Sequence, residues 1–193
     1  MFGCLVGSEM CIRDSAGNAS TARQTRSFEA WITTNKSRGT GGADGSASAA
    51  ATDAATGNRR ALTEALLKGV LQSMFTNGAE PKMAIAGPVN KGVISGFTGR
   101  ANTRQNVSAD TVSASISVYA SDFGELQIVP SNRSRDRSLL LVDPEYAKVA
   151  YLRNFQTMDI AKIGDADTKM ILAEYGLEMS NEAAHGIVAD LTA

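Results

Sequence analysis

The most regular pattern of apolar residues lies between positions 59 and 76, where they recur every three or four residues. This spacing predicts a well-buried helix over residues 59–76, with two neighbouring apolar rows on its inner side. Thr56 or Asn58 is the expected N-cap, and the pair Asn77–Gly78 is the expected left-handed C-cap. The two rows are Leu62, Leu66, Val70 and Met74, and Leu67, Leu71 and Phe75.

A second regular pattern, the alternation of apolar and polar residues over 112–120, predicts a half-buried strand. Val118 and Ala120 belong to the face expected to point inward, and Tyr119 belongs to the opposite face. The segment 122–124, with sequence DFG, is typical of a turn, and the apolar run over 126–129 predicts the returning strand of a hairpin.

Shorter apolar segments predict one more helix and several strands. Gly87–Pro88 is expected to open a helix over 89–97, with Val93, Ile94 and Phe97 directed inward. The expected strands cover residues 82–86, 139–142, 147–152, 160–163 and 169–179. The last is longer than the usual five or six residues, and we expect this chain to leave it without a partner strand.

The N-terminal region consists of three segments that differ in composition. Residues 1–15 hold both cysteines, and their string VGSEMCIRDS resembles translated sequencing-adapter read-through, so we expect them to be unstructured and foreign to the fold; a natural N-terminal peptide is the alternative. Residues 16–38 are polar apart from Phe28, Trp31 and Ile32, whose spacing predicts one or two helical turns packed on another element. Residues 39–57 are small or polar, so we expect a flexible loop.

Composition and charge narrow the functional classes. The 193 residues are 43% hydrophobic and 20% charged, which is typical of a soluble protein with a packed core. The net charge of −1 argues against a large basic surface for nucleic acid or acidic membranes, and no apolar run is long enough for a transmembrane helix. With two cysteines and one histidine, neither a disulfide scaffold nor a histidine-rich metal site is expected.

Motifs that could support catalysis are incomplete. The DFG triplet at 122–124 has none of the other protein-kinase motifs around it, and the single histidine, His185, cannot anchor a zinc site alone. Asp165 and Asp167 lack the rest of a calcium loop, so a turn is the better interpretation. We therefore predict no enzymatic activity, no cofactor and no metal site.

The densest charge cluster is Arg133, Arg135, Asp136 and Arg137. A solvated loop is its ordinary interpretation. The alternative is a contact with another subunit or with nucleic acid, and these four residues are our candidate subunit interface.

Six strings in the second half of the chain, in this order and spacing, are similar to the major capsid (major head) proteins of tailed bacteriophages. The N-terminal strings over 21–26 and 30–32 agree with the same family, so the resemblance covers nearly all of residues 16–193. The six strings are VYASDFG at 118–124, VPSNR at 129–133, LVDPEY at 141–146, YLRNF at 151–155, AKIGD at 161–165 and NEAAHGIVADL at 181–191.

The resemblance implies an α+β fold of the tailed-phage capsid type. Residues 16–38 would follow a spine helix, residues 58–150 would form the axial domain, and residues 151–193 would supply the final strands of the peripheral domain. The N-terminal arm, the protruding loop and the spine helix would precede the present sequence.

The implied function is structural. The protein would self-assemble into an icosahedral head. Its expected partners are other copies of itself and packaged double-stranded DNA, which it would bind without sequence specificity. No membrane partner is expected. It would occur in the virion capsid, and in the cytoplasm of the bacterial host during assembly. Two alternatives are the shell protein of a protein nanocompartment with the same fold, and an unrelated α+β domain that binds a small molecule.

Overall fold

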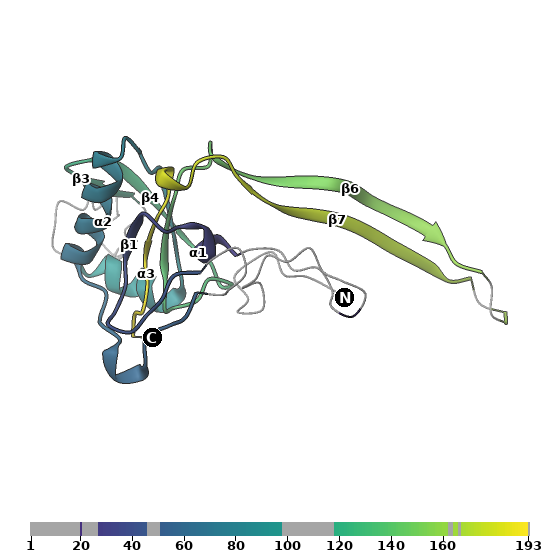
Figure 1. Ribbon diagram of the computed structural model, residues 1–193, viewed down its shortest axis with the longest axis horizontal. Coiled ribbons are helices and arrows are strands. Elements are labelled where there is room, and N and C mark those ends of the chain that lie inside the picture. Colours follow the sequence, from purple (N-terminus) through teal and green to yellow (C-terminus); the bar gives the residue numbers. More distant parts are fainter. Residues whose placement is uncertain are drawn as a thin grey trace, which may run out of the picture.

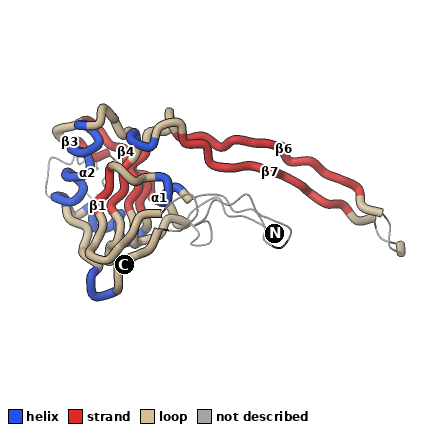
Figure 2. The backbone as a smooth tube through the Cα atoms, in the orientation of Figure 1, coloured by secondary structure: helices blue, strands red, loops and turns tan. Residues whose placement is uncertain are grey.

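The chain forms an α+β fold with a six-stranded sheet and a separate two-stranded ribbon (Figures 1 and 2). The structure, a computed structural model, describes residues 20, 27–45, 51–97, 118–161, 164–165 and 167–192. The helices are α1 (Phe28–Trp31), α2 (Glu64–Thr76) and α3 (Pro88–Ser95), with short 3-10 turns at Thr56–Asn58 and Glu182–Ala184. The strands are β1 (Asn35–Ser37), β2 (Met83–Ala86), β3 (Val118–Ser121), β4 (Gly124–Pro130), β5 (Leu139–Val142), β6 (Ala147–Asp159), β7 (Lys169–Met179) and β8 (Gly186–Val188).

The six-stranded sheet has the order β1-β8-β5-β2-β4-β3. The β1–β8 and β2–β4 pairs are parallel, and the other neighbours are antiparallel. Residues from both ends of the sequence therefore meet in one sheet, which together with α1, α2 and α3 we call the body. We expected residues 151–193 to supply the final strands of a peripheral domain; β8, from this range, lies inside the body, between β1 and β5.

Helix α2 is shorter at its N-terminus than its apolar pattern predicts. The helix begins at Glu64, and the N-cap is Thr63, whose hydroxyl accepts a hydrogen bond from the Leu66 amide. The Arg60 carbonyl, which a longer helix would offer to the Glu64 amide, instead accepts a hydrogen bond from the Thr192 amide at 3.0 Å, and Arg60 forms a β-bridge with Leu191. The backbone at this point is held by the C-terminal segment instead.

The C-terminal end of α2 confirms the predicted cap. Gly78 has a φ of +79°, the left-handed conformation that glycine adopts without strain. The amide of Gly78 donates to the Phe75 carbonyl, and the amide of Ala79 donates to the Met74 carbonyl at 2.9 Å. These two bonds form a Schellman motif, which satisfies carbonyls at the helix end.

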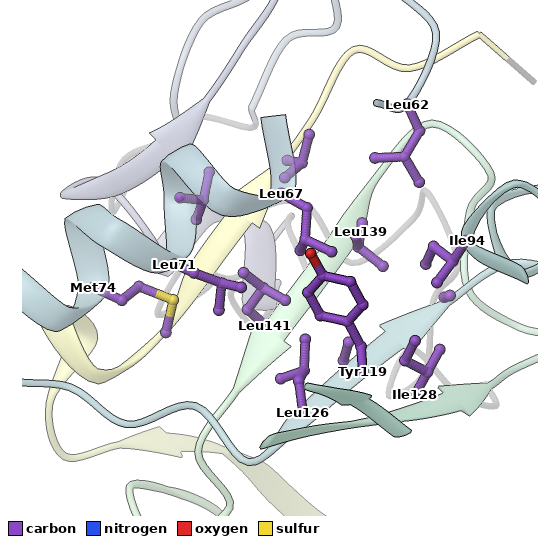
Figure 3. Close-up of a cluster of buried hydrophobic side chains, with 14 of the residues drawn as sticks. Leu62, Leu67, Leu71, Met74, Ile94, Tyr119, Leu126, Ile128, Leu139 and Leu141 are labelled. Carbon is purple, nitrogen blue, oxygen red and sulfur yellow. The ribbon is translucent and has the colours of Figure 1, made fainter. Parts of the chain in front are cut away.

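The core of the body lies between α2, α3 and the sheet (Figure 3). Helix α2 contributes Leu67, Val70, Leu71 and Met74, all at most 2% exposed. The inner side of α2 is narrower than predicted, because Phe75 is 54% exposed and Leu66 is only partly buried. In α3, Ile94 is buried as predicted, but Val93 is 39% exposed. The buried partners in the sheet are Tyr119, Leu126, Ile128, Leu139 and Leu141.

The predicted hairpin exists as β3 and β4, but the inward face of β3 is the opposite of the one we expected. Tyr119 is 1% exposed, whereas Val118 and Ala120 are half-buried. The Tyr119 hydroxyl donates to a carboxylate oxygen of Glu64 at 2.9 Å, so the ring fills the core and its polar end reaches the start of α2. The predicted strand residues 112–117 lie outside the described residues, as do residues 1–15.

The segment that we expected to be a flexible loop is attached to the body in its described parts, 39–45 and 51–57. Asp190, which is fully buried, accepts hydrogen bonds on its carboxylate from the amides of Gly39 at 2.9 Å and Ala54 at 2.8 Å. Asp190 has a φ of 59°. A single carboxylate near the C-terminus thus connects both arms of the segment.

Helix α1 is one helical turn, where the spacing of Phe28, Trp31 and Ile32 predicted one or two. Ser27 caps it, since its hydroxyl accepts a hydrogen bond from the Ala30 amide. Ile32 is fully buried against Ile187, with Phe28 packed beside them. The segment therefore closes the body next to β8.

The long strand β7 has a partner within the chain, which corrects our expectation that it would be left unpaired. It pairs in antiparallel register with β6, from Ala147↔Met179 to Asp159↔Lys169. We expected β6 to end at 152, but it continues to Asp159 across two irregularities in the pairing. The ribbon of β6 and β7 projects away from the body (Figure 1).

Candidate functional site

The described residues contain no group of three or more His, Cys, Asp or Glu side chains that could hold a metal ion. A surface depression lined by Pro88, Pro130, Ser131 and Asn132 presents no titratable side chain. In the parts of the chain that the structure describes, no helix combines the length and apolar character needed to span a membrane. The lack of catalytic activity remains a prediction.

The DFG triplet forms the turn between β3 and β4, as its composition indicates. The Ser121 hydroxyl accepts a hydrogen bond from the Phe123 amide and donates to the Gly124 carbonyl at 2.9 Å. Gly124 has a φ of +123°. The triplet is thus accounted for by the hairpin.

The candidate interface residues have partners inside the chain. Arg135 forms a bidentate ion pair with Asp53, at 3.2 Å for both nitrogens, and a further ion pair with Glu29. Arg137 reaches the same Asp53 carboxylate at 3.2 Å. Although burial alone would lower the pKa of Arg135, the carboxylates of Glu29 and Asp53 hold it above its ordinary value. These ion pairs connect α1 and the 51–57 segment to the loop after β4.

Asp136 and Arg133 have different environments. Asp136 accepts a hydrogen bond from the Val89 amide at 3.0 Å, so it caps the N-terminus of α3. The Asn90 amide group donates to the Asp136 carbonyl at 2.8 Å. Arg133 lies exposed in the turn that follows β4. Of the four candidates, Arg133 is therefore the one most accessible to another subunit.

His185 lies fully buried where the ribbon joins the body. Its Nδ1 accepts a hydrogen bond from the Asp143 amide at 3.3 Å, and its ring meets that of Phe28 edge-on at 5.1 Å. Burial lowers the pKa of the imidazole below its ordinary value, although the Tyr146 backbone and the carboxylates of Asp143 and Glu182 oppose this shift. The folded protein therefore holds His185 in its neutral form.

This environment predicts that stability falls as the pH is lowered through about 6.5, the ordinary pKa of histidine. The unfolded chain binds the proton more readily than the folded chain, so acid favours unfolding, with a limiting slope of about 1.4 kcal/mol per pH unit. Urea unfolding between pH 8 and pH 5.5 measures the slope. Because His185 is the only histidine, His185→Gln should be nearly flat over this range. A wild-type free energy of unfolding that does not change with pH would contradict this prediction.

The two faces of the ribbon differ in chemistry. The register and the alternation of β7 place Val149, Tyr151, Tyr175 and Leu177 on one face. Phe155 joins them, since its ring centroid lies 6.2 Å from that of Tyr175 and 6.5 Å from that of Tyr151. We call this side the apolar face.

The opposite face carries mainly polar side chains near the body. Arg153 and Glu174 form an ion pair at 3.4 Å, and Lys148 is opposite Glu178 in the register. Gln156 is paired with Leu172 on this same face. Near the tip this face also becomes apolar, with Met158 opposite Met170. We call this side the polar face.

Exposed apolar side chains are concentrated on the ribbon. Of the exposed large hydrophobic residues in the described ranges, all but Phe75, Val89 and Val93 lie between Tyr146 and Ile171. Tyr151 is 51% exposed, and Phe155 is 66% exposed. Four of these residues, Val149, Tyr151, Phe155 and Ile171, lie on the apolar face. Exposed apolar patches mark protein contacts, so the apolar face is the candidate assembly surface.

The sequence analysis did not find this surface. It predicted the bounds of β7 correctly, but it ended β6 too early. The irregularities between Tyr151 and Arg153 and between Arg153 and Gln156 break the period of two in β6. The run of aromatic residues around Tyr151 and Phe155 was the available signal, because aromatic residues are enriched in strands.

Comparisons with known proteins identify one family. The family model described as the SU10 major capsid protein matches residues 9–192. The match begins inside the segment that we interpreted as adapter read-through, and that interpretation stays a prediction. No curated protein matches the chain.

Among solved structures, the chain is similar to a virus-like particle from Pyrococcus furiosus, with a TM-score of 0.39 and 12% sequence identity. That similarity covers 66% of this chain and 52% of the other, so the chain spans about half the length of that protein. The family match, in contrast, extends over nearly the whole sequence. The chain belongs to the SU10 major capsid protein family.

Proposed function

We propose that this protein is the structural major capsid protein of a tailed bacteriophage, and that copies of it assemble into an icosahedral head around double-stranded DNA. The observation that carries the proposal is the family match over residues 9–192. The apolar face of the ribbon supports it, because a surface this apolar is expected to be buried by another part of the capsid. The protein acts in the virion, and in the host cytoplasm while heads assemble.

The body and the ribbon correspond to different domains of the proposed capsid subunit. In our proposal the body is the axial domain and the ribbon belongs to the peripheral domain. The ribbon begins at Ala147, and residues 181–192 return to the body. We therefore place the boundary between the axial and peripheral domains at the ends of the ribbon strands rather than at residue 151. Arg133 is our proposed subunit contact within the charge cluster.

The charge of the chain is compatible with enclosing DNA. The chain carries 19 Lys and Arg against 20 Asp and Glu, so its net charge does not favour a strongly basic lining. A basic lining would bind the DNA phosphates tightly and without sequence specificity. A nearly neutral shell contains the DNA while holding it weakly, and this role needs neither a cofactor nor catalytic activity.

The contents of purified particles test the proposal. Particles made in the presence of the phage packaging proteins should protect double-stranded DNA from added nuclease, and the DNA should be released when the shell is denatured. Empty shells from the capsid protein alone serve as the control. Particles that hold a protein cargo and never DNA would contradict the phage-head proposal and favour the nanocompartment alternative.

A further inference from the structure

The ribbon is joined to the body by two short connections, residues 143–146 and 180–185, which we call the root. Hydrogen bonds tie the connections to each other: the Ser180 amide donates to the Tyr146 carbonyl at 2.9 Å, and the Asp143 amide donates to His185 Nδ1 at 3.3 Å. These bonds hold the base of the ribbon together. They do not by themselves fix its direction relative to the rest of the body.

Glu182 connects the root to a segment that is remote in sequence. Its Oε2 accepts hydrogen bonds from the amides of Thr33 at 3.1 Å and Thr34 at 3.4 Å, and its Oε1 accepts one from the Thr34 hydroxyl. Burial alone would raise the pKa of Glu182, but these hydrogen bonds hold it below its ordinary value. The carboxylate is therefore charged near neutral pH. Hydrogen bonds to a charged acceptor are stronger than hydrogen bonds between neutral groups.

Asn35 connects the same root to α2. Its side-chain amide donates to the carbonyls of Ala183 at 2.7 Å and His185 at 3.1 Å. Its Oδ1 accepts hydrogen bonds from the Ser73 hydroxyl at 2.9 Å and from the side-chain Nδ2 of Asn77 at 2.7 Å. Asn35 is fully buried, and its bond to the His185 carbonyl is shielded from water, while the other three bonds are partly buried.

The length of the ribbon makes the geometry of its root important. Strand β6 has 13 residues, which span about 40 Å at the usual rise of a strand. A rotation of about 10° at the root would therefore move the tip by about 7 Å. In a closed shell the angles between subunits decide whether rings close, so a displacement of that size would change the assembly.

We propose that Glu182 is a positioning residue that fixes the direction in which the ribbon leaves the body, and that it does so by clamping the root to the segment Thr33–Asn35. As a statement about shell geometry this rests on the proposed function. As a statement about the subunit it stands on the hydrogen bonds alone. Phe28, whose ring packs on His185, supports the clamp from the same N-terminal segment.

Distances between two spin labels test the clamp directly. In a background in which Cys4 and Cys11 are replaced by serine, labels are attached through Gln72→Cys on the exposed side of α2 and Lys169→Cys at the far end of the ribbon. Pulsed electron spin resonance at pH 7.5 should give one narrow distance distribution. Glu182→Ala should shift it and broaden it by more than about twofold, because the root gains freedom.

Three further variants make the result specific. Thr34→Val removes one donor while keeping the shape of the side chain, and should broaden the distribution to a smaller extent. Glu182→Gln retains an acceptor for the amides of Thr33 and Thr34, so its distance distribution should stay nearly as narrow as that of the wild type. Glu178→Ala is the matched control, since Glu178 is an exposed carboxylate on the ribbon itself, and it should have no effect.

An unchanged distribution in both Glu182→Ala and Thr34→Val would overturn the proposal, as would an equal broadening in Glu178→Ala. Circular dichroism of each variant shows whether the body is still folded. If the Glu182→Ala variant is unfolded, the distance distribution of Thr34→Val decides whether the clamp exists. The measurement uses the unassembled chain. Its failure is therefore distinct from a failure of the protein to form shells.

Discussion

Replacing Tyr151 and Phe155 together by aspartate is expected to abolish the formation of closed shells while the body remains folded. Both rings lie exposed on the apolar face, and an aromatic side chain buries about 150–250 Å² when it is covered. Two carboxylates in their place would have to lose their water on assembly without gaining a partner, which is strongly unfavourable. Electron microscopy measures the yield of particles, and circular dichroism measures the folding of the body.

The matched control for this prediction is a charge on the polar face of the same strand. Gln156→Asp introduces a carboxylate next to Phe155 in sequence but on the opposite face of the ribbon. It should leave the particle yield within about twofold of wild type. If the double variant assembles normally, or if Gln156→Asp also prevents assembly, the apolar face is not the surface that the shell buries.

Leu141→Ala is expected to lower the free energy of unfolding by about 2–5 kcal/mol. Leu141 is fully buried on β5, which pairs with both β2 and β8 at the middle of the sheet. Removing its side-chain carbons loses their transfer free energy and leaves a cavity against α2 that the neighbouring strands cannot close. Urea unfolding followed by circular dichroism measures the change.

The same substitution at Leu152 provides the comparison. Leu152 is 75% exposed on the ribbon, so Leu152→Ala should change the free energy of unfolding by less than about 0.5 kcal/mol. Leu66→Ala should lie between the two, because Leu66 is only partly buried. Equal losses at Leu141 and Leu152 would show that the core is placed incorrectly.

Elements with a sustained period were predictable from the sequence. The helix α2 with most of its buried side, its Asn77–Gly78 cap and the turn between β3 and β4 were found, because local spacing and glycine conformation determine them. The inward face of β3 was not predicted correctly. Apolar residues alternate with serine in this segment, and serine is small enough that either face can be buried. Tyr119 decides the face because its ring fills the core.

Features that depend on distant contacts were not predictable. Strands β1 and β8 have three residues each, too few to show a period, and they pair only because the ends of the chain meet. Arg135 forms ion pairs with Glu29 and Asp53, which lie far from it in the sequence. The hydrogen bonds from Gly39 to Asp190 and from Asn35 to His185 likewise join segments with more than a hundred residues between them, and no local spacing indicates such bonds.

The central claim is that this protein builds a shell, and electron microscopy of the product of its complete reading frame tests that claim most directly. The account predicts uniform, closed, hollow particles at micromolar concentration, formed by heterologous contacts that close into rings. Dynamic light scattering of the same sample should show one large species. A well-behaved full-length monomer that binds a small metabolite and never forms particles would contradict the account.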